Sequence, residues 1–248
     1  MSGLVFRQLF DTTSSTYTYI IGCAVTRLAA IIDPVYEKVS RDVKMVNELD
    51  LKLKYAMNTH CHADHVTGTA ALRSATGCQT IISKASAAQA DMYLNDNEIV
   101  KIGNLNLEAR STPGHTDGCM TFVLHSHKLC FTGDALMIRA CGRTDFQQGD
   151  ARKLYHSVHG RILSLSEDYS VYPAHDYQGR TQSSVREEKL YNPRLTKSED
   201  EFVNIMENLG LKYPAKIDVS VPWNMRCGPT EVEDKEIMAD IAANKPPA

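Results

Sequence analysis

The stretch "NTHCHADHVTG", residues 58–68, decides how the rest of the chain is interpreted. It places five side chains that can bind a metal ion within six positions, namely His60, Cys61, His62, Asp64 and His65. Imidazole and carboxylate ligands together are typical of zinc, iron or manganese sites and not of calcium sites. A structural role alone would not need such a cluster, so we expect these residues to form a metal centre that carries the function.

Three further polar clusters occur in the same context as this stretch. They are "STPGHTDG" with His115, "TGDAL" with Asp134 and "YPAHDY" with His175, and each begins where an apolar strand pattern ends. In α/β sheets the ends of strands gather ligand-binding residues, so the four clusters are expected to converge. An isolated histidine in a loop is usually solvated, but four clusters in one context predict a single site. The candidates suffice for two metal ions, or for one with spare ligands: His60, His62, Asp64, His65, His115, Asp134 and His175.

Hydrophobic periodicity predicts an α/β fold in which strands and helices alternate. Apolar residues spaced by three and four predict a helix over residues 39–49, and alternation over residues 51–57 predicts a strand that runs into the metal-binding stretch. Further elements are expected as a short helix after Thr67, a helix over residues 84–93, and strands over residues 29–34, 80–83, 105–109, 120–124 and 129–132.

The C-terminal part, "REEKLYNPRLTKSEDEFVNIMENLGL", predicts a helix, a break at Pro193 and a second helix. Ser198 and Glu201 have the spacing of a capping box at the start of that second helix. The following "KIDVSVPWNMRCG" is expected to form an extended piece and then a loop. With 248 residues and no linker, the chain is predicted to be a single domain over residues 1–248, with a core of about 6–192 and a C-terminal helix and tail over 193–248.

Composition excludes several classes of protein. A net charge of -3 without a basic cluster argues against nucleic acid as a partner. The apolar runs are far shorter than the roughly 20 residues of a membrane-spanning helix. An odd number of cysteines, seven, with no Cys-x-x-Cys pair argues against a disulfide framework and a zinc ribbon, and fits a reducing compartment. Neither a secretory signal nor an organellar presequence is visible in the first residues, although a processed chain would look the same.

Other residues near these motifs have simpler explanations. His125 and His127 are expected to flank a hairpin turn, and His156 and His159 to lie on a surface helix. In a His-x-His run the middle side chain tends to point away from the target of its neighbours, so Cys61 is not expected to bind the metal.

The motifs "THCHADH", "TPGHT", "TGDAL" and "YPAHDY" resemble those of the metallo-β-lactamase superfamily. The resemblance implies an αββα sandwich, in which two mixed β-sheets are flanked by helices and the metal lies at one edge. In binuclear members, the first metal would be held by His60, His62 and His115, the second by Asp64, His65 and His175, and Asp134 would bridge the two.

Within the superfamily the chain resembles the persulfide dioxygenases, the ethylmalonic encephalopathy protein family, from about Phe6 to Gly228. The segments that carry this resemblance include "FRQLFD", "IDPV", "IRACGRTDFQQG", "NPRLTK" and "VPWNMRCG". It implies oxidation of glutathione persulfide by O2 and water to sulfite and glutathione, in sulfide catabolism. One Fe(II) per chain, without an organic cofactor, would be held by His60, His115 and Asp134.

In that branch the remaining candidates would orient the ligands or hold water through hydrogen bonds, or form an alternative second metal site: His62, Asp64, His65 and His175. Arg143 matches a position of the family's active site and is expected to bind substrate carboxylates, with a salt bridge to Asp145 as the structural alternative. The Tyr177 hydroxyl is expected to donate to substrate or oxygen. Cys141 and Cys227 also match family positions, and Asp176 is expected to orient His175 or to cap the next helix.

Two alternatives stand beside this interpretation. A binuclear zinc thioester hydrolase of glutathione conjugates, of the glyoxalase II type, would use a similar ligand set, but "NPRLTK" and "VPWNMRCG" favour oxidation. A noncatalytic metal-bearing interaction protein is the weakest alternative, because no ligand has been replaced. The expected partners are glutathione persulfide and O2, with no nucleic acid or membrane and with a possible homodimer. The resemblance implies the mitochondrial matrix, with the cytoplasm as the alternative.

Overall fold

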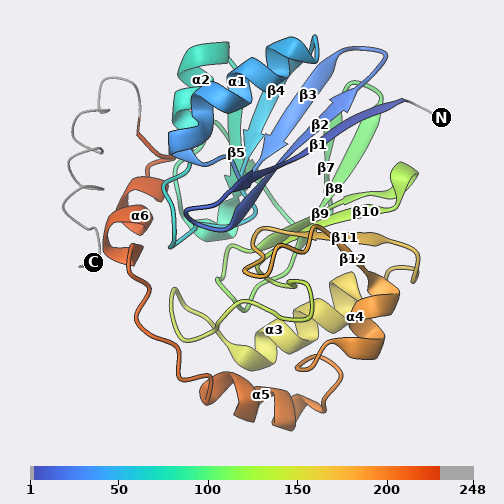
Figure 1. Ribbon diagram of the computed structural model, residues 1–248, viewed down its shortest axis with the longest axis vertical. Helices are drawn as coiled ribbons and strands as arrows, with labels where there is room; N and C mark the ends of the chain where they lie inside the picture. Colours follow the sequence, from blue (N-terminus) through green and yellow to red (C-terminus); the bar gives the residue numbers. More distant parts are fainter. Residues whose placement is uncertain (1–2, 230–248) are drawn as a thin grey trace.

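Two β-sheets of six strands each form the centre of the computed structural model, which describes residues 3–229 (Figure 1). In the first sheet β1 to β3 pair antiparallel and β3 to β6 pair parallel, so the sheet is mixed. Its strands, in spatial order, are β1 (Leu4–Asp11), β2 (Thr16–Cys23), β3 (Leu28–Ile32), β4 (Lys52–Met57), β5 (Gln79–Ser83) and β6 (Met92–Leu94).

The second sheet is also mixed, because β10 and β11 pair parallel and its other neighbours pair antiparallel. Its spatial order is β12 (Ser183–Ser184), β11 (Ser170–Pro173), β10 (Leu129–Gly133), β9 (Met120–Leu124), β8 (Leu105–Ser111) and β7 (Glu98–Ile102). β9 and β10 form a hairpin that is closed by a single 3-10 turn, His125–His127, which confirms the predicted hairpin turn at these two histidines.

Alternating side chains of the two sheets meet in one hydrophobic core. Along β8, Leu105 and Leu107 are fully buried while Asn106 between them is exposed, which is the pattern of a strand with one face on the core. Tyr19 of the first sheet packs against Phe131 of the second, with ring centroids 5.0 Å apart. This core holds the sheets face to face.

Helices cover the outer face of each sheet (Figure 1). Val46 and Leu72 bring α1 (Val39–Glu48) and α2 (Thr69–Thr76) onto the first sheet. The second sheet is covered by α3 (Ala151–Ser157), the π-helical turn η4 (Val158–Ile162), α4 (Val185–Tyr191) and α5 (Glu199–Glu207). α6 (Ile217–Asn224) lies at the edge of the sandwich. The predicted αββα sandwich is therefore confirmed, as is the capping box of Ser198 and Glu201 at the start of α5.

The predicted helix over residues 84–93 is wrong. Only one 3-10 turn, η2 (Lys84–Ser86), forms there, and β6 begins at Met92. Ala87 ends the turn with a left-handed φ of 56°. The Asp91 carboxylate then accepts hydrogen bonds from the amide and hydroxyl of Thr80, which hold the chain beside β5. The alanine-rich sequence favours a helix, but these contacts outside the segment decide its conformation.

The extended piece predicted from Lys216 onward is also wrong, because residues 217–224 form α6. Alternating β-branched residues favoured a strand, and Pro222 cannot donate a hydrogen bond inside a helix. The helix forms nevertheless, since Trp223 and Val219 pack against Val66 in the loop after β4. The last part of the predicted tail, residues 230–248, lies outside the described residues.

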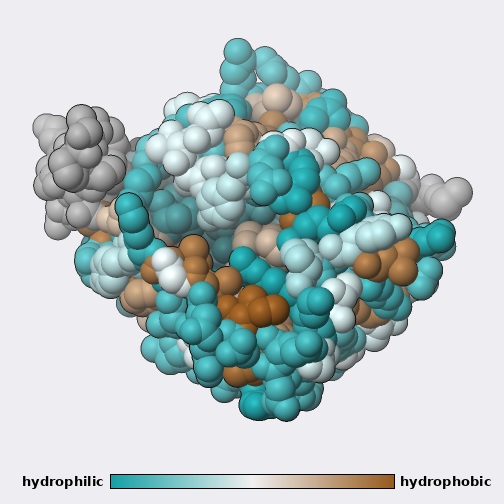
Figure 2. Space-filling view, turned by 60° about the horizontal axis from the view of Figure 1, so that its bottom comes forward, coloured by the Kyte–Doolittle hydropathy of each residue, from teal (hydrophilic) through white to brown (hydrophobic). Residues whose placement is uncertain are grey.

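One face of the molecule shows how polar and apolar residues are distributed at the surface. The face in Figure 2 is predominantly hydrophilic, and its hydrophobic residues form small separate patches. Among residues 3–229, no helix has both the length and the apolar character needed to cross a membrane.

Candidate metal centre

The loops that follow β4, β8, β10 and β11 bring all seven predicted ligands together at one edge of the sandwich. They form two neighbouring groups, and within each group one ligand atom per residue lies within 4.8 Å of all the others. The first group, which we call the A site, consists of His60, His115 and Asp134. The second, the B site, consists of His62, Asp64, His65 and His175. The binuclear assignment places His62 with His60 and His115. Within the 4.8 Å limit His62 falls into the B site, although its ring centroid lies 4.0 Å from that of His60 and 4.3 Å from that of His65.

In the A site two imidazoles and one carboxylate point at a common position. Asp134 Oδ2 lies 3.7 Å from His115 Nε2 and 4.0 Å from His60 Nε2. His60 and Asp134 are buried, and 12% of the His115 side chain is exposed, toward a cavity described below. Two histidines with one carboxylate form a donor set that fits a divalent transition metal and leaves some of its coordination positions open.

Hydrogen bonds determine which ring nitrogen of His60 is free to bind a metal. The Thr59 hydroxyl donates to Asp33 Oδ2 at 2.9 Å and lies 3.0 Å from His60 Nδ1. Because the only proton of that hydroxyl goes to Asp33, His60 Nδ1 must be the donor in the second bond. The lone pair of His60 is therefore on Nε2, which faces Asp134. Burial holds the pKa of His60 well below its usual value, so the ring is neutral and able to bind a metal.

His115 is oriented in the same way by the backbone. Its Nδ1 donates to the carbonyl oxygen of Arg143 at 2.6 Å, which leaves Nε2 for the metal. Gly142 precedes this carbonyl, and its amide donates to the backbone oxygen of Asp134 at 2.7 Å. One short loop therefore holds two of the three A-site ligands in register.

His175 connects the two sites. Its Nδ1 donates to Asp134 Oδ1 at 2.7 Å, and its Nε2 lies 3.0 Å from Asp64 Oδ2. Burial lowers the pKa of His175, but Asp134 and Asp64 outweigh it and raise this pKa well above 6.5. Burial raises the pKa values of Asp134 and Asp64, but the positive charge and hydrogen bonds of His175 outweigh burial and hold both pKa values below the usual range. Both carboxylates are therefore ionised beside a protonated His175.

Unsatisfied nitrogens show that the B site can also accept a ligand. Nδ1 of His62 and Nε2 of His65 are buried without a hydrogen-bond partner among the described residues, whereas His62 Nε2 lies 3.1 Å from Asp33 Oδ1. A buried polar atom left unpaired costs about 1–3 kcal/mol, so a metal ion or an ordered water is expected to satisfy them. The donor set thus fits a metal at both sites. The B site can be a second metal site, or its residues can orient the A-site ligands and hold water.

These pKa shifts predict the stability of the metal-free protein as a function of pH. Burial lowers the pKa of His60 and His62 below 6.5, so the unfolded chain binds more protons below pH 6.5 and stability rises with pH up to that point. Above pH 6.5 the folded chain keeps a proton on His175, so stability falls as the pH rises toward its raised pKa. Each group contributes a slope of at most about 1.4 kcal/mol per pH unit.

We therefore expect the His175 proton to make the free energy of unfolding of the chelator-treated protein fall as the pH rises above 6.5, which urea titrations measure. His175→Gln should remove this decline, and it should change the acidic side as well, because Asp64 and Asp134 lose the cation that lowers their pKa values. The same decline in wild type and His175→Gln would contradict the assignment of the proton to His175.

A cavity of about 560 Å³ opens above the A site. Its lining includes all three A-site ligands together with Asp64, Cys141, Arg143, Tyr177, Arg194, and several residues of the α5–α6 connection. The predicted salt bridge of Arg143 is present, since its Nε and Nη2 lie 2.6 Å and 2.7 Å from the two carboxylate oxygens of Asp145. The predicted role of Arg143 in substrate binding stays a prediction.

Tyr177 lies in the wall of this cavity, and its ring stacks on His175 with centroids 6.2 Å apart. Although 69% of the residue is exposed, desolvation raises the pKa of Tyr177 to about 12. The phenol is therefore protonated at neutral pH and can donate a hydrogen bond into the cavity.

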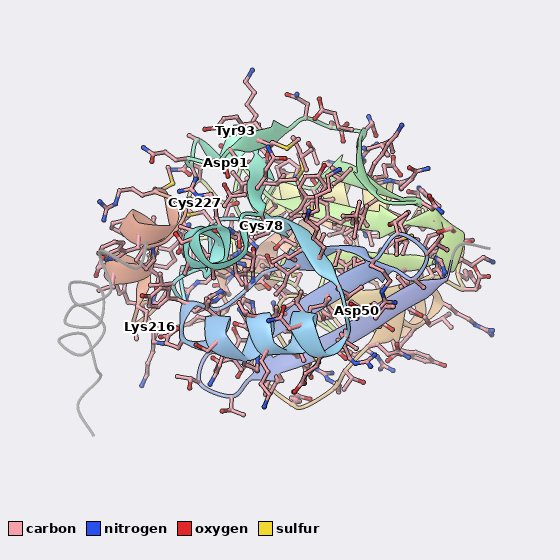
Figure 3. The ribbon with its side chains drawn as sticks, turned by 90° about the horizontal axis from the view of Figure 1, so that it is seen from above. Asp50, Cys78, Asp91, Tyr93, Lys216 and Cys227 are labelled. Atoms are coloured by element: carbon pink, nitrogen blue, oxygen red, sulfur yellow. The ribbon has the colours of Figure 1, made fainter. Side chains whose placement is uncertain are left out.

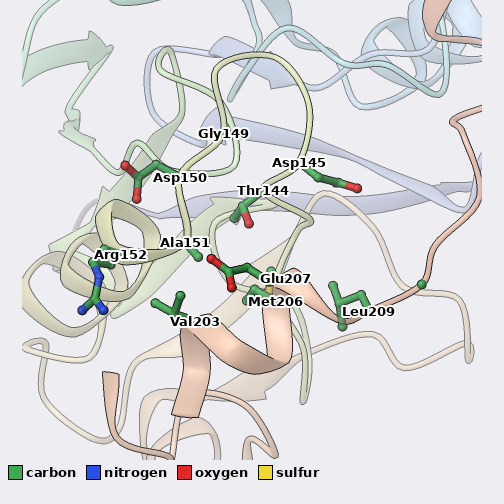
Figure 4. Close-up of a pocket in the computed structure, with 11 residues that line it drawn as sticks. Thr144, Asp145, Gly149, Asp150, Ala151, Arg152, Val203, Met206, Glu207 and Leu209 are labelled. Carbon is green, nitrogen blue, oxygen red and sulfur yellow. The ribbon is translucent and has the colours of Figure 1, made fainter. Parts of the chain in front are cut away.

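A second cleft lies between the loop after Arg143 and α5 (Figure 4). It is lined by Thr144, Asp145, Asp150, Arg152, Met206 and Glu207, among others. Arg152 is paired there with Glu199 and Asp200 of α5. Neither metal site contributes a side chain to this cleft, so we do not regard it as part of the metal centre.

Three other predictions can be compared with the structure. Cys61 belongs to neither metal site, as expected, and burial raises the pKa of its thiol to about 12. Cys141 lines the cavity with its sulfur 3.6 Å from that of Met206. The expectation for Asp176 is wrong: its carboxylate accepts from the amides of Gln178 and Arg180 in a turn, and neither orients His175 nor caps a helix.

Two residues of the centre were not recognised in the sequence. Asp33 follows β3 as the ligands follow their strands, so the same rule could have found it. Asn224 could not have been found, because its segment was expected to be a loop. Its side chain donates to the carbonyls of His62 and His65 at 2.8 Å and 2.9 Å and accepts from the amide of Thr67 at 2.8 Å.

Asn224→Asp should lower the free energy of unfolding by about 2–4 kcal/mol, because two buried carbonyls lose their donors. Urea titration of the metal-free protein measures this. Asn208→Asp, at an exposed residue after α5, serves as the control and should change little. An equal loss in both variants would show that Asn224 does not hold the loop.

Comparison with known proteins agrees with this geometry. The family model of the metallo-beta-lactamase superfamily matches residues 11–96 and 94–175. The human protein named persulfide dioxygenase ETHE1, mitochondrial, is 55% identical over 91% of this chain and 89% of its own. The crystal structure of ETHE1 from Myxococcus xanthus is 48% identical, covers 91% of this chain and all of its own, and superimposes with a TM-score of 0.88.

Hydrolases of the same superfamily are more distant. The hydroxyacylglutathione hydrolase GloC of Haemophilus influenzae is 33% identical over 67% of this chain and 87% of its own. The human ETHE1 relative covers a larger share of this chain, 91% against 67%. The chain therefore belongs to the metallo-β-lactamase superfamily and, within it, to the persulfide dioxygenase ETHE1 family.

Proposed function

We propose that this protein is a persulfide dioxygenase that oxidises glutathione persulfide with O2 and water to sulfite, glutathione and two protons. The observation that carries the proposal is a group of two histidines and one carboxylate in a chain 55% identical to a protein named persulfide dioxygenase. We assign one Fe(II) to the A site, where His60 Nε2, His115 Nε2 and an Asp134 oxygen would hold it.

When bound there, Fe(II) supplies the redox chemistry that lets triplet O2 react, which zinc cannot supply because it does not change its oxidation state. The residues around the A site keep its ligands in place. Thr59 and the Arg143 carbonyl fix the two imidazoles, and His175 occupies Asp134 Oδ1 so that Oδ2 faces the histidines.

The cavity provides the place for the substrate. A persulfide is more acidic than the corresponding thiol, so it enters as an anion that a cationic metal centre attracts. Tyr177 keeps its proton at neutral pH and is assigned to donate a hydrogen bond to the substrate or to oxygen. Arg143 lines the same wall of the cavity.

The decisive experiment begins with anaerobic purification and quantification of the bound metal. Two activities are then measured, the uptake of O2 with glutathione persulfide and the hydrolysis of a lactoyl thioester of glutathione. About one iron per chain and O2 consumption that matches sulfite formation support the proposal. Two zinc ions per chain with thioester cleavage and no O2 uptake would overturn it.

The second candidate is a binuclear thioester hydrolase. It is favoured by the unsatisfied nitrogens of His62 and His65 in the B site and by the hydroxyacylglutathione hydrolase relative. The same experiment separates the two activities.

The names of the ETHE1 relatives also support a mitochondrial location, which we propose for this protein. Imaging of the full-length chain in its own cells tests the location. We further expect a homodimer, which light scattering of the purified protein tests.

A further inference from the structure

One wall of the cavity above the A site consists of the segment that connects α5 to α6, residues 211–216. In Figure 1 this segment runs from α5 to α6 along one edge of the sandwich, and its residues line the cavity above the A site. It contributes two cations, Lys212 and Lys216, and Figure 3 shows Lys216 at the start of α6. Within residues 3–229, neither ammonium group pairs with a carboxylate.

Arg143, the cation expected to bind substrate, is already engaged. Both carboxylate oxygens of Asp145 neutralise its guanidinium, and its side chain is only 16% exposed. Its remaining nitrogen, Nη1, donates to the backbone carbonyl of Lys212 at 2.8 Å. The guanidinium also lies over the Phe146 ring, 4.6 Å from its centroid. Arg143 thus links the loop after β10 to the segment that connects α5 and α6.

A second contact holds the connecting segment in place. The Tyr213 ring meets the edge of Phe146 with centroids 5.4 Å apart, and the Tyr213 hydroxyl donates to Asp218 Oδ1 at 2.7 Å. The backbone that carries Lys212 and Lys216 is therefore fixed against Arg143 and Phe146 in the loop after β10. Fixed cations bind an anion with a smaller loss of conformational entropy than a mobile loop would.

The charges around the cavity are divided between its floor and its wall. Asp64 and Asp134 lie at the floor, where both contact His175 and where a bound metal would neutralise them further. On the wall, Arg194 donates to the Cys141 carbonyl at 3.1 Å and has no carboxylate partner among the described residues. With Lys212 and Lys216, the wall therefore carries an excess of positive charge.

We propose that Lys212 and Lys216 bind the two carboxylates of the glutathione moiety and that Arg143 positions the wall without contacting the substrate. The inference rests on the proposed function for the identity of the ligand. A cavity of about 560 Å³ has the size that small organic ligands require. Glutathione carries its reactive sulfur between two terminal carboxylates, so the sulfur can reach the metal at the floor while both termini meet the cationic wall.

Calorimetric titration of the iron-loaded protein with S-methylglutathione, which cannot be oxidised as a persulfide, tests this assignment. The double variant Lys212→Gln/Lys216→Gln should bind about 5- to 20-fold more weakly, since two exposed ion pairs are lost. Its iron content should equal that of wild type. Lys101→Gln, an exposed lysine on β7, is the matched control and should bind like wild type.

A modified ligand sharpens the test. The ethyl ester of the glycine carboxylate of S-methylglutathione should bind wild type more weakly than the free acid, and this difference should shrink in the double variant. Arg143→Lys should lower both ligand affinity and iron content, because it loosens the wall together with the His115 loop. The lysine variants should lower affinity alone.

Equal affinity of wild type and double variant, or an ester penalty that persists in the double variant, would overturn the assignment of the lysines. These outcomes are independent of catalysis. A protein that binds S-methylglutathione through the lysines but consumes no O2 would refute the dioxygenase and leave the binding wall in place.

Discussion

His115→Ala should purify with almost no iron, whereas His62→Ala should keep much of it. His115 Nε2 is one of only three donors of the A site, and its removal leaves a histidine and a carboxylate that cannot hold Fe(II) against a chelator. His62 lies in the B site, so its loss disturbs the surroundings of the metal but removes no ligand. A change of that kind typically costs 10–100-fold in metal affinity. Metal analysis after anaerobic dialysis against a weak chelator measures both variants.

The control for this comparison is folding. Both variants should retain the far-ultraviolet circular dichroism and the cooperative unfolding of the metal-free wild type, because His115 is partly exposed and His62 Nδ1 has no hydrogen-bond partner among the described residues. Equal loss of metal from His115→Ala and His62→Ala would instead favour the binuclear arrangement. O2 uptake should follow the iron content, so His115→Ala should be inactive.

Gly142→Ala is expected to have the second largest effect. A Cβ at this position would lie 2.6 Å from the Asp134 carbonyl oxygen and 2.8 Å from His115 Nδ1. Both are closer than atoms can approach, and neither neighbour can move without displacing a ligand of the A site. We expect a loss of about 1–3 kcal/mol in the free energy of unfolding from overpacking. Iron affinity should fall about 10- to 100-fold, as for other changes that misorient a ligand.

Gly160→Ala provides the matched control, because a Cβ there meets no atom within 4 Å. This variant should keep the iron content, O2 uptake and stability of wild type. Iron titration followed by ultraviolet–visible spectroscopy, with urea unfolding in parallel, compares the two variants. Wild-type iron affinity in Gly142→Ala would show that the loop of residues 141–145 does not determine the position of His115.

Much of the fold could be predicted from the sequence because its strands follow local rules. β4, β8, β9 and β10 alternate or are continuously apolar, and the helices α1, α2 and α5 have clear periodicity or caps. The convergence of His60, His115, Asp134 and His175 could be predicted as well, since each follows a strand and such ends meet at one edge.

The parts that could not be predicted depend on contacts between distant segments. Residues 84–93 depend on the bonds between Asp91 and Thr80, and α6 depends on the packing of Trp223 against Val66. The division of the ligands into two groups is implied by the family resemblance and not by their spacing. His62 follows His60 by two residues, and its ring centroid lies 4.0 Å from that of His60 and 4.3 Å from that of His65.

The hydrogen bonds of Asn224 also have a consequence for the biosynthesis of the protein. Asn224 closes the metal-binding stretch from a position 162 residues further along the chain than His62. At about 5–20 residues per second, the ribosome takes on the order of 10–30 s to reach it. During that time the histidines of the nascent chain lack the clamp that shapes their loop. Loading with iron is therefore expected to follow release of the chain from the ribosome, and a nascent chain arrested before Asn224 should remain free of metal.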